Sequence, residues 1–257
     1  MKVVCFIPAR VGASRFPGKV LAPIAGRPML EHCYRGAAES DLLDEVVVAT
    51  CDAEIEAWAS GAGIPCVLTS PAHERATDRV AEAAGRWDAD VVVLVQGDEP
   101  LVTPDMVDAA LGPVLSGEAA CTNLIKRIDD EEDFRSPNTV KVVFDLQKRA
   151  LAFTRSLVPS PDRLGFAGIA AYKQVAVFGF TRERLLEFSQ LPPTPLEIAE
   201  SVDMLRYLEH GRAIQLVETE RTTHGVDVPG DVAVVERILA ARARARSADP
   251  TRGEHRL

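Results

Sequence analysis

The feature that most restricts the fold is an alternation of short apolar runs with helix-like segments in the N-terminal part of the chain. The apolar runs are rich in β-branched residues and are found at Val3–Ile7, Glu45–Thr50, Pro65–Leu68 and Val91–Val95. Strands that alternate with helices build βαβ units, whose helices cover both faces of a mainly parallel sheet. The sequence therefore predicts an α/β fold with a Rossmann-like, mainly parallel sheet.

A basic loop that contains glycines follows the first of these runs and covers residues 8–19. Open α/β sheets bind their ligands at the carboxyl ends of the strands, which is where this loop falls. Gly12 and Gly18 allow the backbone to approach a polyanion closely. The loop also carries guanidinium and ammonium groups suited to phosphate oxygens, at Arg10, Arg15 and Lys19. This composition predicts a cradle for a nucleotide triphosphate.

Two common phosphate-binding loops do not match this segment. A P-loop has four residues between its first glycine and its Gly-Lys pair, which Ser or Thr then follows. Here five residues separate Gly12 from Gly18, and Val20 follows Lys19. The dinucleotide fingerprint G-x-G-x-x-G is also absent from the loop. A solvated basic turn with no ligand is the remaining alternative.

A second polar motif, Gln96-Gly97-Asp98-Glu99-Pro100, follows the run Val91–Val95. That run is the most strand-like in the chain, so we expect it at the centre of the sheet. A carboxylate at the tip of a central strand is well placed to hold a hard cation, and Gly97 lets the chain turn there. Asp98 is therefore a candidate magnesium ligand, and the alternative is an ordinary polar turn.

Charge and cysteine content limit the class of protein. A formal net charge of -9 and a pI near 5.2 argue against a general nucleic-acid or membrane surface. The chain has five cysteines, an odd number, and they are scattered along the sequence. This pattern is typical of free thiols in a protein of the reducing cytoplasm. With neither a signal peptide nor a long apolar span evident, we expect a soluble cytoplasmic protein.

Three local expectations concern helix ends and acidic residues. Asp52 is expected to cap the helix that follows it. A helix that Thr194 caps is expected to run without a break to Gly211. The acidic run Asp129–Asp133 is expected to be a solvated helix start and not a metal site, because no histidine is near it in the sequence.

The loop pattern P-A-R-x-x-x-S-R-x-P-G-K resembles the signature of the sugar-nucleotidyltransferase superfamily, and most closely that of the CMP-Kdo synthetases, the 3-deoxy-manno-octulosonate cytidylyltransferases. V-Q-G-D-E-P at 95–100 is similar to a second motif of this family. Weaker similarity is seen at 73–79, 137–143 and 224–231. The resemblance implies one nucleotidyltransferase domain over 1–240, with a β-rich arm over about 137–190 that builds a homodimer. Residues 241–257 are expected to form a flexible basic tail.

This resemblance also implies an activity and the residues that carry it. The chain would transfer CMP from CTP to a small acid and release pyrophosphate, with Mg²⁺ held by Asp98 and Asp227. Arg10 and Lys19 would complete the catalytic set. The residues expected to bind the nucleotide are Pro8, Ala9, Arg10, Gly12, Ser14, Arg15, Lys19, Thr77, Arg79 and Gln96.

The acceptor half departs from the family pattern. The usual histidine and tyrosine of H-x-G-x-Y fall on Gln174 and Phe178, and the usual Glu-Gln pair falls on Asp203 and Met204. These changes remove partners for sugar hydroxyls, so a phosphonate such as phosphonoformate is expected at least as readily as Kdo. The residues expected to bind the acceptor are Arg155, Lys173, Gln174, Phe178 and Asp203. An inactive nucleotide-sensing paralogue is the alternative from another functional class.

Overall fold

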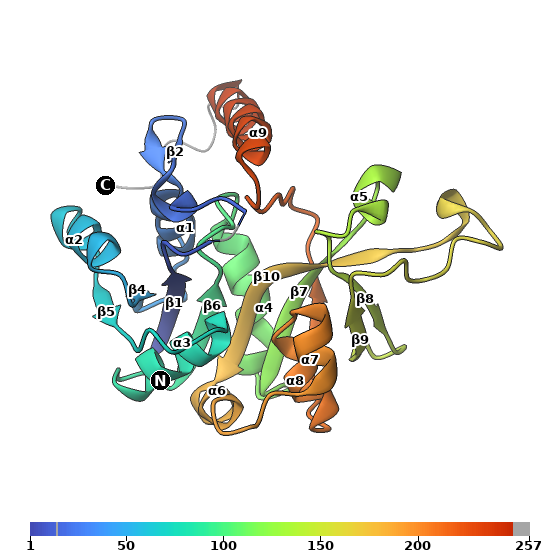
Figure 1. Ribbon diagram of the computed structural model, residues 1–257, viewed down its shortest axis with the longest axis horizontal. Coiled ribbons are helices and arrows are strands. Elements are labelled where there is room, and N and C mark those ends of the chain that lie inside the picture. Colours follow the sequence, from blue (N-terminus) through green and yellow to red (C-terminus); the bar gives the residue numbers. More distant parts are fainter. Residues whose placement is uncertain (14, 249–257) are drawn as a thin grey trace.

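The computed structural model describes residues 1–13 and 15–248 of the chain. Within this part a nine-stranded sheet has the main order β11-β7-β10-β6-β1-β4-β5 (Figure 1). The bounds of these strands are β1 Val3–Ala9, β4 Glu45–Thr50, β5 Cys66–Leu68, β6 Val91–Val95, β7 Cys121–Arg127, β10 Tyr172–Thr181 and β11 Gln215–Glu218. β1 runs parallel to β4 and β6, while β10 enters antiparallel between β6 and β7. The predicted mixed fold with a mainly parallel central sheet is confirmed.

Helices pack on both faces of this sheet, because side chains of the buried strands alternate between the faces. Val3, Cys5 and Ile7 pack in one core with α1, α2, α4 and α9, and Val4 and Phe6 pack in the other with α3, α6 and α8. The helix bounds are α1 Met29–Ala38, α2 Ala53–Gly61, α3 Ala76–Gly85, α4 Pro104–Leu115, α5 Glu131–Arg135, α6 Arg182–Phe188, α7 Pro195–Glu200, α8 Met204–Glu209 and α9 Pro229–Ala248. Because helices cover both faces of the sheet, a ligand can reach the sheet only at the ends of its strands.

An arm projects from one side of the sheet (Figure 1). It contains the hairpin of β8 (Lys141–Phe144) and β9 (Ala150–Thr154), which pairs with the first residues of β10. The fully buried Lys141 anchors the arm, because its ammonium donates to the carbonyls of Ser136, Thr139 and Arg155 at 2.7–3.0 Å.

The helix expected to run from Thr194 to Gly211 is interrupted, so that prediction is wrong in part. Thr194 does precede α7, but α7 ends at Glu200 and α8 begins at Met204. Between them Ser201 has left-handed backbone angles, φ 53° and ψ 53°, which are uncommon for a serine and which no local sequence pattern predicts. The break brings Asp203 to the start of α8 and into the site described below.

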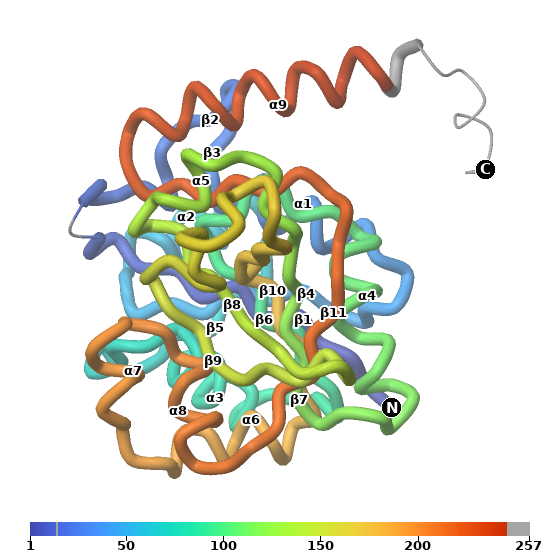
Figure 2. The backbone as a smooth tube through the Cα atoms, turned by 90° about the vertical axis from the view of Figure 1, so that its right-hand side faces the viewer, coloured from blue at the N-terminus to red at the C-terminus, as the bar shows by residue number. Residues whose placement is uncertain are grey.

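The C-terminal region and the short elements complete the fold. α9 runs across the molecule beside β2 (Pro23–Ile24) and β3 (Arg27–Pro28), and continues to Ala248, into the segment expected to be a tail (Figure 2). The remainder of that segment, 249–257, lies outside the described residues. All five cysteines are free thiols. Across residues 1–13 and 15–248, no helix is long and apolar enough to cross a membrane.

Candidate active site

Two adjoining cavities open at the carboxyl ends of β1 and β6. The first, of about 280 Å³, lies over the β1 loop and the start of α3, and the second, of about 940 Å³, lies between the β6 loop and the arm. Five of the described residues line both cavities and so mark where the two meet, namely Gln96, Asp98, Ser201, Asp203 and Asp227. We call them the nucleotide cavity and the acceptor cavity, after the sequence-based expectation for each.

The loop after β1 is shaped by backbone contacts and by one distant carboxylate. Gly18 has a φ of 71°, and its amide donates to the Val11 carbonyl at 2.9 Å. The amide of Val11 donates to Oδ2 of Asp52 at 2.8 Å, and Asp52 makes no capping hydrogen bond in α2. The expectation that Asp52 caps α2 is therefore confirmed for its position, because Asp52 is the N-cap residue, but it is wrong for its carboxylate, which holds the loop instead. Ser14, expected to bind nucleotide, lies outside the described residues.

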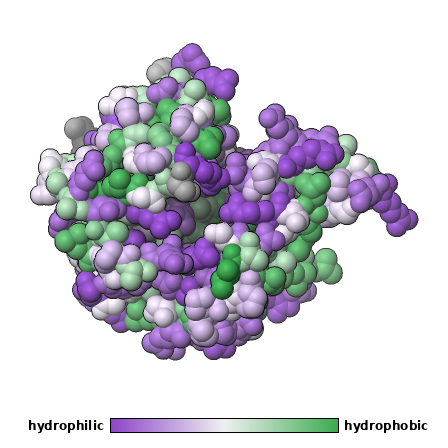
Figure 3. Space-filling view, viewed as in Figure 1, coloured by the Kyte–Doolittle hydropathy of each residue, from purple (hydrophilic) through white to green (hydrophobic). Residues whose placement is uncertain are grey.

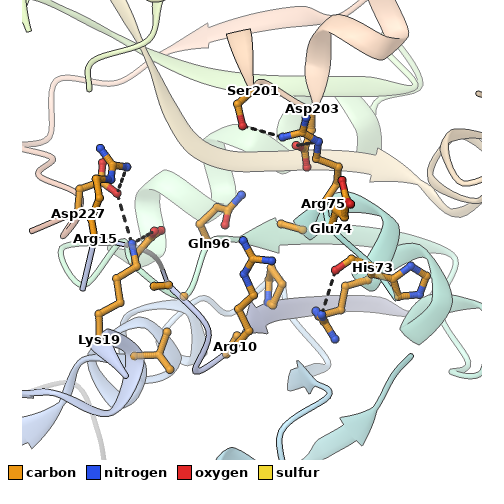
Figure 4. A pocket seen from close by; sticks show the side chains of 18 residues that line it. Arg10, Arg15, Lys19, His73, Glu74, Arg75, Gln96, Ser201, Asp203 and Asp227 are labelled. Atoms are coloured by element: carbon orange, nitrogen blue, oxygen red, sulfur yellow. Dashed lines mark hydrogen bonds and ion pairs between the residues drawn. The ribbon is translucent and has the colours of Figure 1, made fainter. Parts of the chain in front are cut away.

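Two of the three cations of this loop, Arg15 and Lys19, converge on two carboxylates (Figure 4). Nζ of Lys19 lies 2.7 Å from Oδ2 of Asp98 and 3.4 Å from Oδ1 of Asp227. The Arg15 guanidinium lies 2.9 Å from the same Asp227 oxygen. Arg10 points into the nucleotide cavity and makes no ion pair with the described residues. Cations and acids thus meet at the junction of the cavities, where charge on a polyanion would be balanced.

A close backbone crossing sets the position of Asp98. A Cβ at Gly97 would lie 2.8 Å from the Pro8 carbonyl oxygen, so only glycine fits without a shift. The loop before α9 then pairs with this turn, since the Val226 amide donates to the Asp98 carbonyl at 3.0 Å. As a result Asp98 and Asp227, which are far apart in sequence, share one cation.

These two carboxylates fit a hard divalent cation, because a single ammonium already lies within ion-pair distance of both. No group of three or more His, Cys, Asp or Glu side chains in residues 1–13 and 15–248 could enclose a metal. The protein would therefore supply two carboxylates, and a bound triphosphate would have to supply further oxygens.

The segment at the start of α3 is buried, and the alternative reading of a solvated Arg79 is wrong. Arg79 is 3% exposed and donates to the Thr69 hydroxyl at 2.6 Å. Thr77 is 1% exposed and donates through its amide and its hydroxyl to Oδ2 of Asp203, at 3.1 and 2.9 Å. Burial raises the pKa of Asp203, although these hydrogen bonds oppose that shift. Thr77 thus supports the cavity from behind its wall, whereas Arg79 reaches the wall.

Both cations expected to anchor a small dianion already have partners in the protein, Lys173 an acid and Arg155 backbone carbonyls. Nζ of Lys173 lies 2.7 Å from Oδ2 of Asp133. Nε of Arg155 donates to the Glu200 carbonyl at 2.8 Å, and another guanidinium nitrogen donates to the Pro137 carbonyl at 3.0 Å. Burial alone would raise the pKa of Asp133, but the charge and hydrogen bond of Lys173 lower it. These cations therefore hold the cavity wall together.

Glu99 is an unusual acid on the wall of the acceptor cavity. It is 9% exposed, and its Oε2 has no hydrogen-bond partner among the described residues. Burial raises the pKa of Glu99 to about 7, and the nearby charge of Asp98 adds to the shift while that of Lys173 opposes it. An unpaired buried oxygen at this place is a strong point of contact for a donor.

The structure brings together most of the residues expected from the sequence. Those that line the nucleotide cavity are Pro8, Ala9, Arg10, Arg15, Lys19, Arg79, Gln96, Asp98 and Asp227. The acceptor cavity is lined by all five residues expected to bind the acceptor, which are Arg155, Lys173, Gln174, Phe178 and Asp203. Gln96, Asp98 and Asp227 line it as well, and Asp203 also lines the nucleotide cavity. Gly12 and Thr77 line neither cavity. The binding roles of these residues stay predictions.

Sequence reasoning did not select several other lining residues. Arg75 and Ser201 face the nucleotide cavity, where Arg75 donates to the Ser201 hydroxyl at 2.7 Å (Figure 4). Asp133 and His224 face the acceptor cavity. The acidic run does begin α5, and Asp130 accepts from the Asp133 amide, but Asp133 itself is partly buried and paired with Lys173. No local sequence signal marks these residues, because each depends on a segment far away in the chain.

Comparison with known proteins gives a consistent result. A family model described as cytidylyltransferase matches residues 4–214. A 3-deoxy-manno-octulosonate cytidylyltransferase of Geotalea uraniireducens (strain Rf4) is 43% identical over 249 residues, which cover 93% of this chain and 99% of the relative. The protein of the same name from Myxococcus xanthus (strain DK1622) is 44% identical over 242 residues, which cover 94% and 98%.

A solved structure is similar over nearly the same span. A CMP:2-keto-3-deoxy-manno-octonic acid synthetase complexed with CTP superposes with a TM-score of 0.85 at 35% identity. The match covers 94% of this chain and 100% of the solved chain.

Proposed function

Because the chain belongs to the cytidylyltransferase family, as its loop motifs predict, we propose that it transfers CMP from CTP to 3-deoxy-manno-octulosonate (Kdo). It is a nucleotidyltransferase that uses CTP. Relatives that cover almost its full length are Kdo cytidylyltransferases, which supports Kdo as the acceptor. The expectation of a phosphonate acceptor has no support in these comparisons. Of its two proposed anchors, Lys173 is already ion-paired, and the Arg155 guanidinium already donates to backbone carbonyls.

The observation that carries this proposal is the meeting of Lys19 with Asp98 and Asp227 between the two cavities. We assign the triphosphate to Arg10, Arg15 and Lys19, with the base and ribose over the start of α3 and Gln96. The acceptor then lies beyond Asp98, on the side of the arm. This order places an acceptor oxygen next to the phosphate nearest the ribose.

In the proposed reaction, a hydroxyl oxygen of the acceptor forms a bond to the α-phosphorus of CTP and its proton passes to water. The bond from that phosphorus to the bridging oxygen breaks, and pyrophosphate leaves with the bonding electrons. Asp98 and Asp227 would hold Mg²⁺, which would neutralise phosphate charge when bound. The protein contributes alignment of two anions and cations that stabilise the charge of the leaving group. No covalent protein intermediate is required.

We further propose that the arm forms a homodimer interface. Large apolar side chains are exposed on the arm and on α7, among them Leu151, Leu164 and Ile198 at 62–63% exposure. Apolar surface is visible along the arm in Figure 3. A second copy of this chain would remove this surface from water. Light scattering on the purified protein tests the proposal, since a monomer at micromolar concentration would contradict it.

The experiment that tests the function is pyrophosphate release from CTP and Mg²⁺ with Kdo, a sialic acid or phosphonoformate. We expect Kdo to have the highest kcat/KM. A higher kcat/KM for phosphonoformate would contradict the proposed acceptor, and release with none of the three acids would contradict the proposed class of acceptor.

A further inference from the structure

Two amide side chains meet where the acceptor cavity reaches the sheet. Nε2 of Gln174, on β10, lies 2.7 Å from Oδ1 of Asn123, on β7. Gln174 lines the acceptor cavity, and Asn123 is fully buried behind it. An amide presents a donor on one side and an acceptor on the other, so its orientation decides what a ligand finds there.

The surroundings of Asn123 determine its orientation. Its Nδ2 lies 2.8 Å from the Val175 carbonyl, 3.1 Å from that of Leu124 and 3.3 Å from that of Val177. If the amide were turned over, its oxygen would face three carbonyl oxygens in a buried site, which is strongly unfavourable. The Nδ2 group therefore faces the carbonyls, and Oδ1 faces Gln174.

The orientation of Gln174 follows from that of Asn123. Because Oδ1 of Asn123 can only accept, Gln174 must turn its NH₂ group toward it. Oε1 of Gln174 has no hydrogen-bond partner within residues 1–13 and 15–248. The side chain thus offers a carbonyl oxygen, which can only accept a hydrogen bond, to a ligand in the cavity.

A β-bulge explains why a buried asparagine is needed here. Val175 of β10 pairs with Leu124 of β7, and the next pair is Phe178 with Asn123. Three steps along β10 therefore correspond to a single step along β7. Asn123 donates to the carbonyls of Val175 and Val177, which lie in the part of β10 where this shift interrupts the regular pairing with β7. The bulge also touches the nucleotide side, since the Gln96 amide donates to the Ala176 carbonyl at 3.0 Å.

From this geometry we propose that Asn123 is a positioning residue that locks Gln174 with its carbonyl oxygen toward the acceptor cavity, so that Gln174 selects acceptors carrying a hydroxyl group at that point. The inference rests on the proposed Kdo cytidylyltransferase activity. A phosphonate dianion has no proton to donate to this oxygen and would be repelled by it. Gln174 therefore favours a polyhydroxylated acid, although it stands where the family pattern has histidine.

The test uses Gln174→Met, which keeps the length of the side chain but removes the carbonyl. We expect the KM for Kdo to rise about five- to tenfold, with kcat and the KM for CTP within about twofold of wild type. A series of Kdo analogues that each lack one hydroxyl identifies the partner. For wild type, the KM for one of these analogues should exceed the KM for Kdo by a similar factor. For that analogue, Gln174→Met should cause no further rise in KM, because the hydroxyl that Gln174 binds is already missing. The matched control is Gln190→Met, an exposed glutamine after α6.

Asn123→Leu tests the positioning role, because leucine fills a similar volume without the amide. The preference for Kdo over that one analogue should fall in Asn123→Leu by at least about threefold, since the Gln174 amide can then turn over. Thermal unfolding with and without CTP shows whether each variant is folded.

The outcomes separate the two proposals. If wild type does not use Kdo, the proposed function fails. Suppose that wild type uses Kdo, so that the proposed function stands. The inference about Gln174 is then overturned if Gln174→Met leaves the KM for Kdo unchanged. It is also overturned if Gln174→Met weakens every analogue by the same factor as Kdo. An unchanged preference in folded Asn123→Leu overturns the positioning role.

Discussion

The ammonium of Lys19 lies 2.7 Å from a carboxylate oxygen of Asp98, and this contact joins the loop after β1 to the turn after β6. The Lys19 side chain is 12% exposed, so its charge is partly shielded from water and its interactions are stronger than those of a surface pair. A bound triphosphate would offer this ammonium a more highly charged partner, which would free Asp98 for a metal. The same contact therefore bears on both the nucleotide and the metal assignments.

Asp98→Asn and Asp227→Asn should each abolish turnover and leave the fold intact. A neutral amide offers one weak ligand oxygen where a charged one is needed. Pyrophosphate release at saturating Mg²⁺ measures the effect, and thermal unfolding serves as the check on folding. Asp88→Asn, on the exposed segment before β6, is the matched control. Near-normal turnover in either site variant would refute the metal assignment.

Lys19→Ala and Arg15→Ala should weaken CTP binding about tenfold or more. Charge-assisted hydrogen bonds to phosphate contribute about 1.5–3 kcal/mol, which corresponds to this factor. Isothermal titration calorimetry with CTP and Mg²⁺ measures the loss, with Arg35→Ala on the exposed side of α1 as the control. Unchanged affinity in both loop variants would mean that this loop does not hold the triphosphate.

The raised pKa of Glu99 should make the stability of the ligand-free protein depend on pH. Its pKa lies near 7 in the fold against an ordinary value of 4.5, so the folded state binds the proton more tightly. The stabilisation is present below about pH 4.5 and is lost as the pH rises through about 7. Relative to Glu99→Gln, wild type should lose up to about 3 kcal/mol of unfolding free energy between these limits.

Urea unfolding in the presence of EDTA at pH 5 and pH 8 measures this difference. Glu118→Gln, on the exposed turn after α4, is the control and should show no such trend. If the difference between wild type and Glu99→Gln is the same at both pH values, Glu99 does not carry the proton.

The parts of this site that depend on local sequence could be predicted. A glycine between a central strand and an acid predicted the turn at Gly97, and the structure adds the reason, which is the nearby Pro8 carbonyl. The loop cations were likewise identifiable, because their spacing after a strand is a short-range pattern.

Contacts between distant segments could not be predicted. Lys173 looks like a free anchor until β10 brings it 2.7 Å from Asp133, which is 40 residues away in the sequence. The Asp52 carboxylate is expected from the sequence to cap a helix, but it accepts a hydrogen bond from the distant Val11 amide instead. A single sequence shows which groups are charged but not which charges are already satisfied. The acceptor half, where most side chains are paired across the arm, was therefore harder to interpret than the nucleotide half.

The buried ion cluster behind the nucleotide cavity should be the most sensitive point for stability. Arg206 is 3% exposed and donates to both oxygens of Glu197, at 2.7 and 2.8 Å, and to both oxygens of Asp78, at 2.8 and 3.0 Å. Arg206→Met would leave the carboxylate of Glu197, itself 1% exposed, with the longer 3.3 Å ion pair to Arg75 and the 3.3 Å hydrogen bond from the Thr194 amide. Removal of one partner from a buried pair costs about 3–5 kcal/mol.

Urea unfolding of Arg206→Met should show this loss, whereas Arg212→Met, which breaks a partly exposed pair with Glu187, should lose less than about 1 kcal/mol. Adding Glu197→Gln to Arg206→Met should restore part of the stability, because the unpaired buried charge is then gone. If the double variant is instead less stable than Arg206→Met by the full cost of a second lost interaction, the destabilisation does not come from the unpaired buried charge. Arg206 would then stabilise the fold mainly by packing over the Phe188 ring, 4.1 Å away.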